Sequence, residues 1–276
     1  MKRLLLLMIM AAGFSCTPSR KMAGIPAADR ALADSVLAFG LDHEAVYSLL
    51  DTLKPISSLK LLWYPIAKDS TMAEGDVQVV KDLAVLDKID QYQRLCRSLS
   101  RGDWQFVLIP FNMTSKQQRS MEIYVVRKAR FAAVLREHAA FFGQWGFTAA
   151  SDPAVVLTAI EFERQPDRYR AYGYLFGYPP YAVDFFVEST LKTEADPAKK
   201  LVPRDFFQVP VFAGKSGYFT YAMPKGHQPG AQDSTLYNKA VQTLERYKNM
   251  RPQYISKGGF RATALWMDWN GSKPRK

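Results

Sequence analysis

The stretch from Pro166 to Leu191 constrains the fold more than any other, because it is the most aromatic part of the chain. Its pattern predicts a helix that begins near Pro166, where the missing N–H of proline costs nothing in a first turn. The Gly-Tyr-Pro-Pro sequence at 177–180 ends this helix and starts a second one. The aromatic residues of the first helix fall at helical spacing and predict one apolar face: Tyr169, Tyr172 and Phe176.

This corner has two interpretations. In the first, the two helices pack tightly and the aromatic side chains fill the middle of a core. In the second, the corner forms a cleft in which Tyr174, Tyr178 and Tyr181 stack on a ligand such as a sugar ring. Asp184 or Glu188 would then be the polar partner of that ligand. We expect the packed corner and keep the cleft as the alternative.

The N-terminus is typical of an exported protein. A short basic segment, 1–3, precedes an apolar run at 4–12 that is too short to span a bilayer as a helix. The run is followed closely by Cys16, with the small residue Ser15 before it. These sixteen residues resemble the lipobox signal of bacterial lipoproteins, although Gly13 and Phe14 depart from its usual pattern.

The resemblance implies cleavage before Cys16 and acylation of its thiol with chains such as palmitate. Several acyl chains would anchor the protein durably in a membrane. Thr17 after the cysteine implies the outer membrane, with the rest of the chain outside the inner membrane. The predicted organisation is a signal peptide (1–15), the lipidated cysteine with a flexible tether (16–27), a globular domain (28–270) and a disordered tail (271–276).

The second cysteine, Cys96, lies in line with the apolar residues of a predicted helix. If Cys16 is acylated, Cys96 has no partner for an intramolecular disulfide. A reactive thiol needs a basic and exposed setting, and the sequence around Cys96 shows none. We therefore expect a buried, inert thiol.

The chain carries a formal net charge of +11, which favours anionic partners. An anionic component of the cell envelope or a partner protein fits this charge. Nucleic acid is the least favoured partner, because no zinc-finger spacing, RNA-binding aromatic signature or basic zipper accompanies the charge.

Helical patterns dominate the remainder, and β-forming stretches are few. We expect a single helix-rich α+β domain with two β-hairpins and a C-terminal strand. The predicted helices include 29–39, 42–53, 81–99, 128–145, 152–164 and 234–250. The predicted strands are 103–111 with 122–127 across a polar loop at 112–120, 205–212 with 218–223, and a last strand at 261–269, while 59–66 fits a strand or a helix.

No stretch carries a complete catalytic motif. Gly214-Lys215-Ser216 resembles the end of a phosphate-binding loop, but it leads into a strand rather than a helix. His227 lies in a proline-stiffened loop beside Lys225 and could transfer a proton or share an anion with Lys215 and Lys225. The sequence predicts no metal site and no cofactor.

Glu161, Glu163 and Asp167 are acidic residues close enough in sequence to supply paired carboxylates for glycoside chemistry. The distance between carboxyl groups decides that mechanism, and sequence alone does not give it.

From the export signal and the lack of a complete catalytic motif, we expect an envelope lipoprotein with a non-catalytic binding or assembly role. The alternative is an envelope hydrolase of a glycan or cell-wall substrate that uses His227, Asp184 or Glu188.

Overall fold

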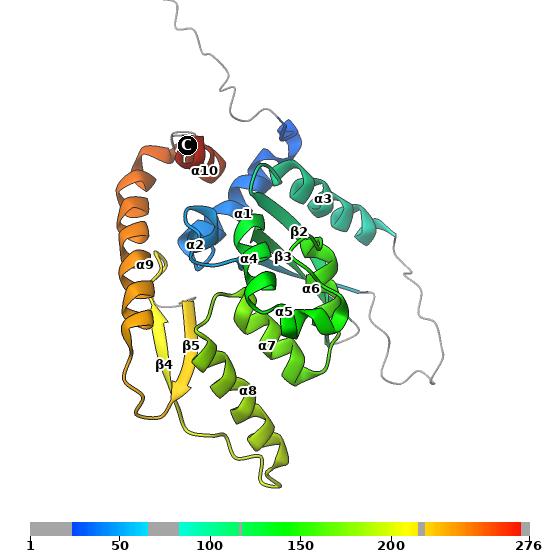
Figure 1. Ribbon diagram of the computed structural model, residues 1–276. Coiled ribbons are helices and arrows are strands. Elements are labelled where there is room, and N and C mark those ends of the chain that lie inside the picture. The colour runs from blue at the N-terminus through cyan, green and yellow to red at the C-terminus, as the bar shows by residue number, and fades with distance from the viewer. Residues whose placement is uncertain (1–23, 66–82, 116–117, 215–218, 272–276) are drawn as a thin grey trace, which may run out of the picture.

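The computed structural model describes residues 24–65, 83–115, 118–214 and 219–271. At its centre is a three-stranded antiparallel sheet with the order β1-β3-β2, formed by Ile56–Tyr64, Gln118–Arg127 and Trp104–Ser115. Helices cover both faces of this sheet (Figure 1). The predicted α+β class of a single helix-rich domain is confirmed.

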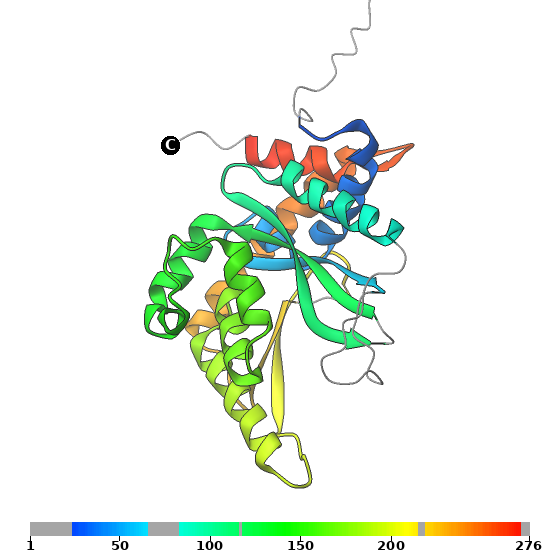
Figure 2. The ribbon, with the colours of Figure 1, turned by 90° about the vertical axis from the view of Figure 1, so that its right-hand side faces the viewer.

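One face of the sheet packs on the N- and C-terminal helices. Ile123 and Val125 of β3 and Phe106 of β2 join a large core with these helices. Figure 2 shows α3, α1 and α10 above the sheet. The elements of this layer are η2 (Ala27–Asp29), α1 (Arg30–Asp42), α2 (Val46–Leu49), α3 (Ala84–Leu99), α9 (Ala231–Met250), η4 (Arg251–Tyr254) and α10 (Ala262–Gly271).

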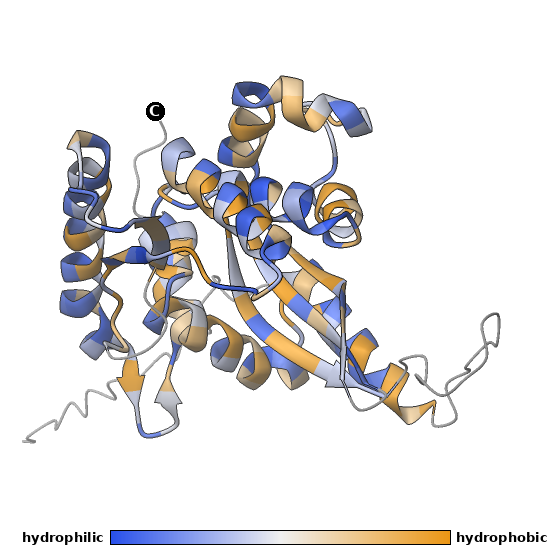
Figure 3. Ribbon diagram, turned by 90° about the horizontal axis from the view of Figure 1, so that it is seen from below, coloured by the Kyte–Doolittle hydropathy of each residue, from blue (hydrophilic) through white to orange (hydrophobic). Residues whose placement is uncertain are grey.

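The opposite face packs on the middle of the chain. Tyr124 and Val126 of β3 and Val107 of β2 form a second core with these helices. The elements of this layer are α4 (Lys128–Glu137), α5 (Ala139–Phe142), η3 (Gly143–Trp145), α6 (Pro153–Glu161) and α7 (Gln165–Leu175). Figure 3 shows hydrophobic and hydrophilic residues alternating along the helices, as expected where each helix buries one face.

A long helix and a second hairpin extend from these layers. Helix α8 (Pro180–Ala195) packs on the hairpin of β4 (Arg204–Val209) and β5 (Phe219–Pro224). A third, very short hairpin joins β6 (Ile255–Ser256) to β7 (Gly259–Phe260). Both predicted hairpins, β2–β3 and β4–β5, are therefore present.

The predicted corner at 166–191 is confirmed as a pair of helices, α7 and α8. Gly177 has φ +78°, a left-handed conformation that glycine adopts without strain. The N–H of Gly177 donates to the carbonyl of Tyr174, and the N–H of Tyr178 donates to the carbonyl of Gly173. These two bonds satisfy carbonyls at the end of α7, as in a Schellman motif.

The predicted C-terminal strand at 261–269 is wrong, because this segment forms α10. Its Leu265, Trp266 and Trp269 are all buried. Trp266 packs edge-on against Trp104 and Phe106 of the sheet layer. A short helix that is buried on most sides has apolar residues one after another, as a buried strand does. Its composition therefore did not distinguish a helix from a strand.

Three smaller predictions also need correction. The helix expected at 128–145 is interrupted at His138, whose φ of −114° and ψ of 36° end α4. The helix expected at 42–53 is only Val46–Leu49. The loop expected at 112–120 is largely strand, because β2 continues to Ser115 and β3 begins at Gln118.

The ambiguous segment at 59–66 lies mostly in β1. The side chain of Ile25, inside the predicted tether, is buried in the core, so the packed part of the chain begins before residue 28. Cys96 is buried as expected, and burial raises the pKa of its thiol to about 12. Within the described residues, no helix combines the length and apolar character needed to cross a membrane.

Candidate functional site

A cavity of about 810 Å³ lies between the central sheet, the α7–α8 pair and the β4–β5 hairpin. Its walls come from the end of β2, Tyr124 of β3, the end of α6, one face of α7, the first turns of α8, and β4 with β5. The lining is mostly aromatic and aliphatic. The segments that meet here lie between residues 111 and 222, so only the folded chain brings them together.

The apolar face predicted for α7 forms one wall. Tyr169, Tyr172 and Phe176 all line the cavity. The close approach of α7 to α8 requires glycine at 173, because a Cβ there would lie 2.7 Å from Cγ2 of Val183. The corner is packed as expected, with Tyr172, Tyr174 and Phe176 against the second core, and it also borders the cavity.

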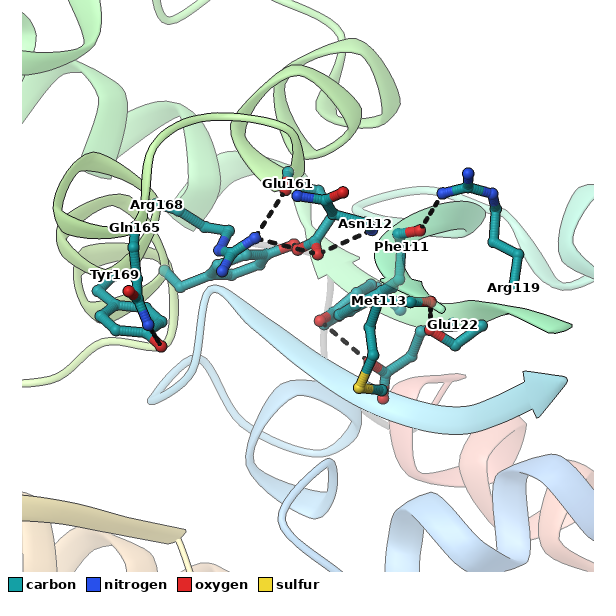
Figure 4. A network of polar contacts seen from close by, with 12 residues as sticks. Phe111, Asn112, Met113, Arg119, Glu122, Glu161, Gln165, Arg168 and Tyr169 are labelled. Carbon is teal, nitrogen blue, oxygen red and sulfur yellow. Dashed lines mark hydrogen bonds and ion pairs between the residues drawn. The ribbon is translucent and has the colours of Figure 1, made fainter. Parts of the chain in front are cut away.

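The polar end of the cavity arises from an irregularity in β2. The register between β2 and β3 shifts between Pro110 and Thr114, so the intervening residues leave the regular ladder. Side chains bind the backbone groups that the ladder no longer pairs. The N–H of Asn112 donates to Oε1 of Glu161 at 3.2 Å, and the carbonyl of Phe111 accepts from Nη1 of Arg119 at 2.8 Å (Figure 4).

Glu161 is the centre of this polar end. Glu161 is only 3 % exposed. Its carboxylate accepts a hydrogen bond of 2.8 Å from the Tyr172 hydroxyl in addition to the one from the N–H of Asn112. Nη1 of Arg168 lies 3.9 Å from Oε1 of Glu161 and donates to the Glu161 carbonyl at 3.2 Å. Figure 4 shows Arg168 directed toward Glu161. The buried carboxylate is thus paired and hydrogen-bonded, which offsets its desolvation.

A second carboxylate, Glu122, belongs to the same network but does not line the cavity. It accepts hydrogen bonds from the hydroxyls of Ser58 and of Tyr124, the latter at 3.3 Å. Burial raises the pKa of Glu122 from 4.5 to about 7, against the lowering effect of the Tyr124 hydroxyl. The negative charges of Glu44 and Glu161 raise it further.

Of the three tyrosines proposed to stack on a ligand, Tyr178 lines the cavity. The ring of Tyr174 instead stacks on that of His138, with 3.7 Å between centroids, and its hydroxyl accepts from Arg170. Tyr181 donates a hydrogen bond of 2.8 Å to Asp233. Tyr174 and Tyr181 do not belong to the lining.

Asp233 explains the position of Tyr181. This buried carboxylate accepts from the hydroxyls of Tyr181 and Tyr221, and from the N–H of Gly230 at the start of α9. Burial raises the pKa of Asp233, but the hydrogen bonds from Tyr221, Gly230 and Tyr181 outweigh it, and the net pKa lies below the ordinary value. The ring of His227 stacks on that of Tyr181 at 4.8 Å.

The other candidate residues do not converge on the cavity. Asp184 forms an ion pair with Arg170, and Glu188 is exposed on α8. Lys225 pairs with Asp205 at 2.6 Å, which lowers the pKa of that carboxyl. His227, Lys225, Asp184 and Glu188 are all absent from the lining. Cys16 and Lys215 lie outside the described residues.

The proposed acidic group is divided in the same way. Glu163 accepts a hydrogen bond from Trp145 at 2.9 Å, and Asp167 pairs with Arg164 at 3.4 Å. Only Glu161 of the three lines the cavity. Across residues 24–65, 83–115, 118–214 and 219–271, no three His, Cys, Asp or Glu side chains gather as a metal site would require.

Sequence reasoning missed Asn112, Phe206 and Tyr221 as parts of this site. The signal for Asn112 was weak, since a polar residue after a strand is usual in a loop. Phe206 and Tyr221 occupy adjoining strands of a hairpin whose position against α8 no local pattern gives.

Comparison of the chain with protein-family models, with curated proteins and with solved structures finds no match.

Proposed function

We propose that this chain is a cell-envelope lipoprotein whose globular part binds a small, largely apolar ligand without turning it over. The observation that carries the proposal is the cavity of about 810 Å³, with aromatic walls and a few polar groups gathered at one end. Ligand sites in proteins typically have volumes of roughly 300–1,000 Å³ and this mixture of apolar walls and convergent polar groups.

The polar groups favour binding over catalysis. Glu161 is already engaged by Tyr172, Asn112 and Arg168, so it does not offer a free base to a reacting atom. The histidine considered as a catalytic group, His227, stacks on Tyr181 outside the cavity. A general acid or base must reach the proton that it transfers.

Filling the cavity tests this proposal. Ala222 of β5 lines the cavity and lies opposite Phe206 of β4. We expect Ala222→Phe to weaken binding of an uncharged fluorescent probe, Nile red, by about tenfold or more, because the new ring occupies ligand space. Ala140→Phe, on the exposed surface of α5, is the matched control and should leave binding unchanged. Failure of the unmodified protein to bind Nile red or any extracted lipid would overturn the proposal.

The anchor is proposed from residues 1–16 alone. Acylation at Cys16 would hold the ligand-binding part at a membrane surface, and the outer membrane is the proposed location. The net charge of +11 supports an anionic envelope component as a neighbour. Intact mass of protein from a bacterial membrane fraction tests the anchor. A chain that starts at Cys16 with added acyl mass is expected, and Cys16→Ala should abolish that mass.

A second candidate function is hydrolysis of a glycan. The observation that favours it is Glu122, whose pKa of about 7 suits a general acid. Glu122 does not line the cavity, so its proton would have to pass through the hydroxyl of Tyr124, which does. Under this hypothesis, a panel of chromogenic glycosides includes one that the protein cleaves and that Glu122→Gln does not. Absence of turnover on a broad panel, together with retained Nile red binding, would favour the binding function.

A further inference from the structure

Arg168 is the charged group of the cavity with hydrogen-bond donors to spare. It lies on α7, lines the cavity, and its side chain is 21 % exposed. Its hydrogen bond to the carbonyl of Glu161 and its ion pair with the Glu161 carboxylate both use Nη1. Within the described residues, Nε and Nη2 form no hydrogen bond, and both atoms are accessible to solvent. A planar guanidinium with open N–H groups suits a carboxylate or phosphate.

Glu161, the other charged residue of the lining, is not available to bind a cationic ligand. Its carboxylate is buried, accepts hydrogen bonds from Tyr172 and from the backbone of Asn112, and faces Arg168. A ligand cation would therefore be repelled by Arg168, and Glu161 already has its positive partner. The free N–H groups of Arg168 favour an anion at this end of the cavity.

The wall that α8 and β5 contribute to the cavity is apolar. It includes Val183, Phe186 and Ala222, and neither element contributes a charged residue to the lining. The rim is apolar as well, because two lining residues are strongly exposed: Phe206 at 57 % and Met113 at 48 %. An exposed apolar rim that leads into a cavity is typical of a binding site for an apolar group.

We infer that the ligand is an amphiphile with an apolar body and an anionic head, a carboxylate or a phosphate, and that Arg168 binds the head. The inference rests on the proposed binding function and names its ligand class. The apolar body lies between α8 and β5, and the head lies beside α7, where Arg168 donates from Nη2 and Nε.

Three probes with the same chain test the inference: dodecanoate, dodecyl phosphate and dodecanol, each used below the concentration at which it aggregates. Displacement of Nile red gives the affinity of each probe. We expect at least one anionic probe to bind about tenfold or more tightly than dodecanol, because a charge-assisted hydrogen bond replaces a neutral one. The stronger of the two anions identifies the head as a carboxylate or a phosphate.

Variants of two arginines on the same helix separate the head group from the fold. Arg168→Gln should bring the anionic probes to the affinity of dodecanol, whose own affinity should stay the same, and Arg168→Lys should restore part of the preference. Arg170→Gln is the matched control, because Arg170 pairs with Asp184 outside the cavity. It should leave the preference intact.

The outcomes distinguish this inference from the proposed function. If dodecanol binds as tightly as both anions, or if Arg168→Gln keeps the preference while its melting temperature matches that of the unmodified protein, the inference is wrong and the binding function stands. If Nile red and all three probes fail to bind, the binding function itself is wrong. A fourth probe, dodecylamine, tests the sign of the charge: if it binds more tightly than both anions, the inference is also wrong.

Discussion

The Lys54 ammonium donates a hydrogen bond of 2.7 Å to the Glu44 carboxylate, and the two side chains differ in exposure, 0 % against 23 %. The ammonium also lies over the rings of Phe219 and Phe176, 4.4 Å and 4.8 Å from their centroids. Burial lowers the pKa of Lys54, and Glu44 counteracts this effect. The charge of Lys54 is fully buried and needs the opposite charge of Glu44, whereas the Glu44 carboxylate is also reached by water.

The unequal burial predicts unequal effects of substitution. Glu44→Gln leaves a buried ammonium without its counter-charge and should cost about 3–5 kcal/mol of stability. Lys54→Met leaves a carboxylate that water reaches, and should cost clearly less. Urea denaturation of both variants and of the double variant measures the difference.

The loss in Glu44→Gln should also depend on pH. The unfolded chain binds a proton at Lys54 more tightly than the folded chain, so the stability of this variant should rise with pH toward 10. A larger loss in Lys54→Met than in Glu44→Gln would contradict this account of the pair.

Glu122 predicts a second dependence on pH. Because the folded chain holds the Glu122 proton more tightly than the unfolded chain, the free energy of unfolding should fall as pH rises from 4.5 through about 7. Glu122→Gln removes this effect and should be more stable than the unmodified protein by roughly 2–3 kcal/mol at pH 9, with little difference at pH 4. Thermal unfolding across this range checks the prediction, and exposed Glu188→Gln serves as the control.

The joint between α7 and α8 predicts a glycine requirement. A Cβ at Gly177 would lie 2.9 Å from the carbonyl oxygen of Leu53, in addition to the strain of a φ of +78°. Gly146 has a similar φ of +74°, with nothing within 4 Å of its Cβ position. Gly177→Ala should therefore cost about 2–3 kcal/mol or more, and Gly146→Ala only about 1 kcal/mol. Equal costs by urea denaturation would show that the contact with Leu53 is unimportant.

The C-terminal helix predicts a contrast between two tryptophans. Trp266 of α10 is 1 % exposed and packs against Trp104 and Phe106, whereas Trp63 of β1 is 40 % exposed. Trp266→Ala should cost about 3–5 kcal/mol or prevent folding, because it opens a large void in the core. Trp63→Ala should cost about 1 kcal/mol or less. Circular dichroism and melting temperatures of the two variants test whether α10 belongs to the core.

Local chemistry predicted the corner around Gly177, because glycine after a helix and proline before the next act over a few residues. It could not predict α10, since its apolar residues follow one another as they would in a buried strand. The break at His138 carries no glycine or proline, and the ring contact there is with Tyr174, which lies far along the chain. The cavity could not be predicted for a different reason. Its lining comes from segments far apart in the chain, such as α7 and β5, and local sequence patterns do not show which segments pack together.

Asp233 gives the cavity a fixed corner. This one carboxylate joins Tyr181, in the first turn of α8, to Tyr221 in β5, so the two facing walls are tied at that end. The two hydrogen bonds hold α8 and β5 at one spacing beside Tyr181, so a ligand too wide for the cavity there would have to break one of them.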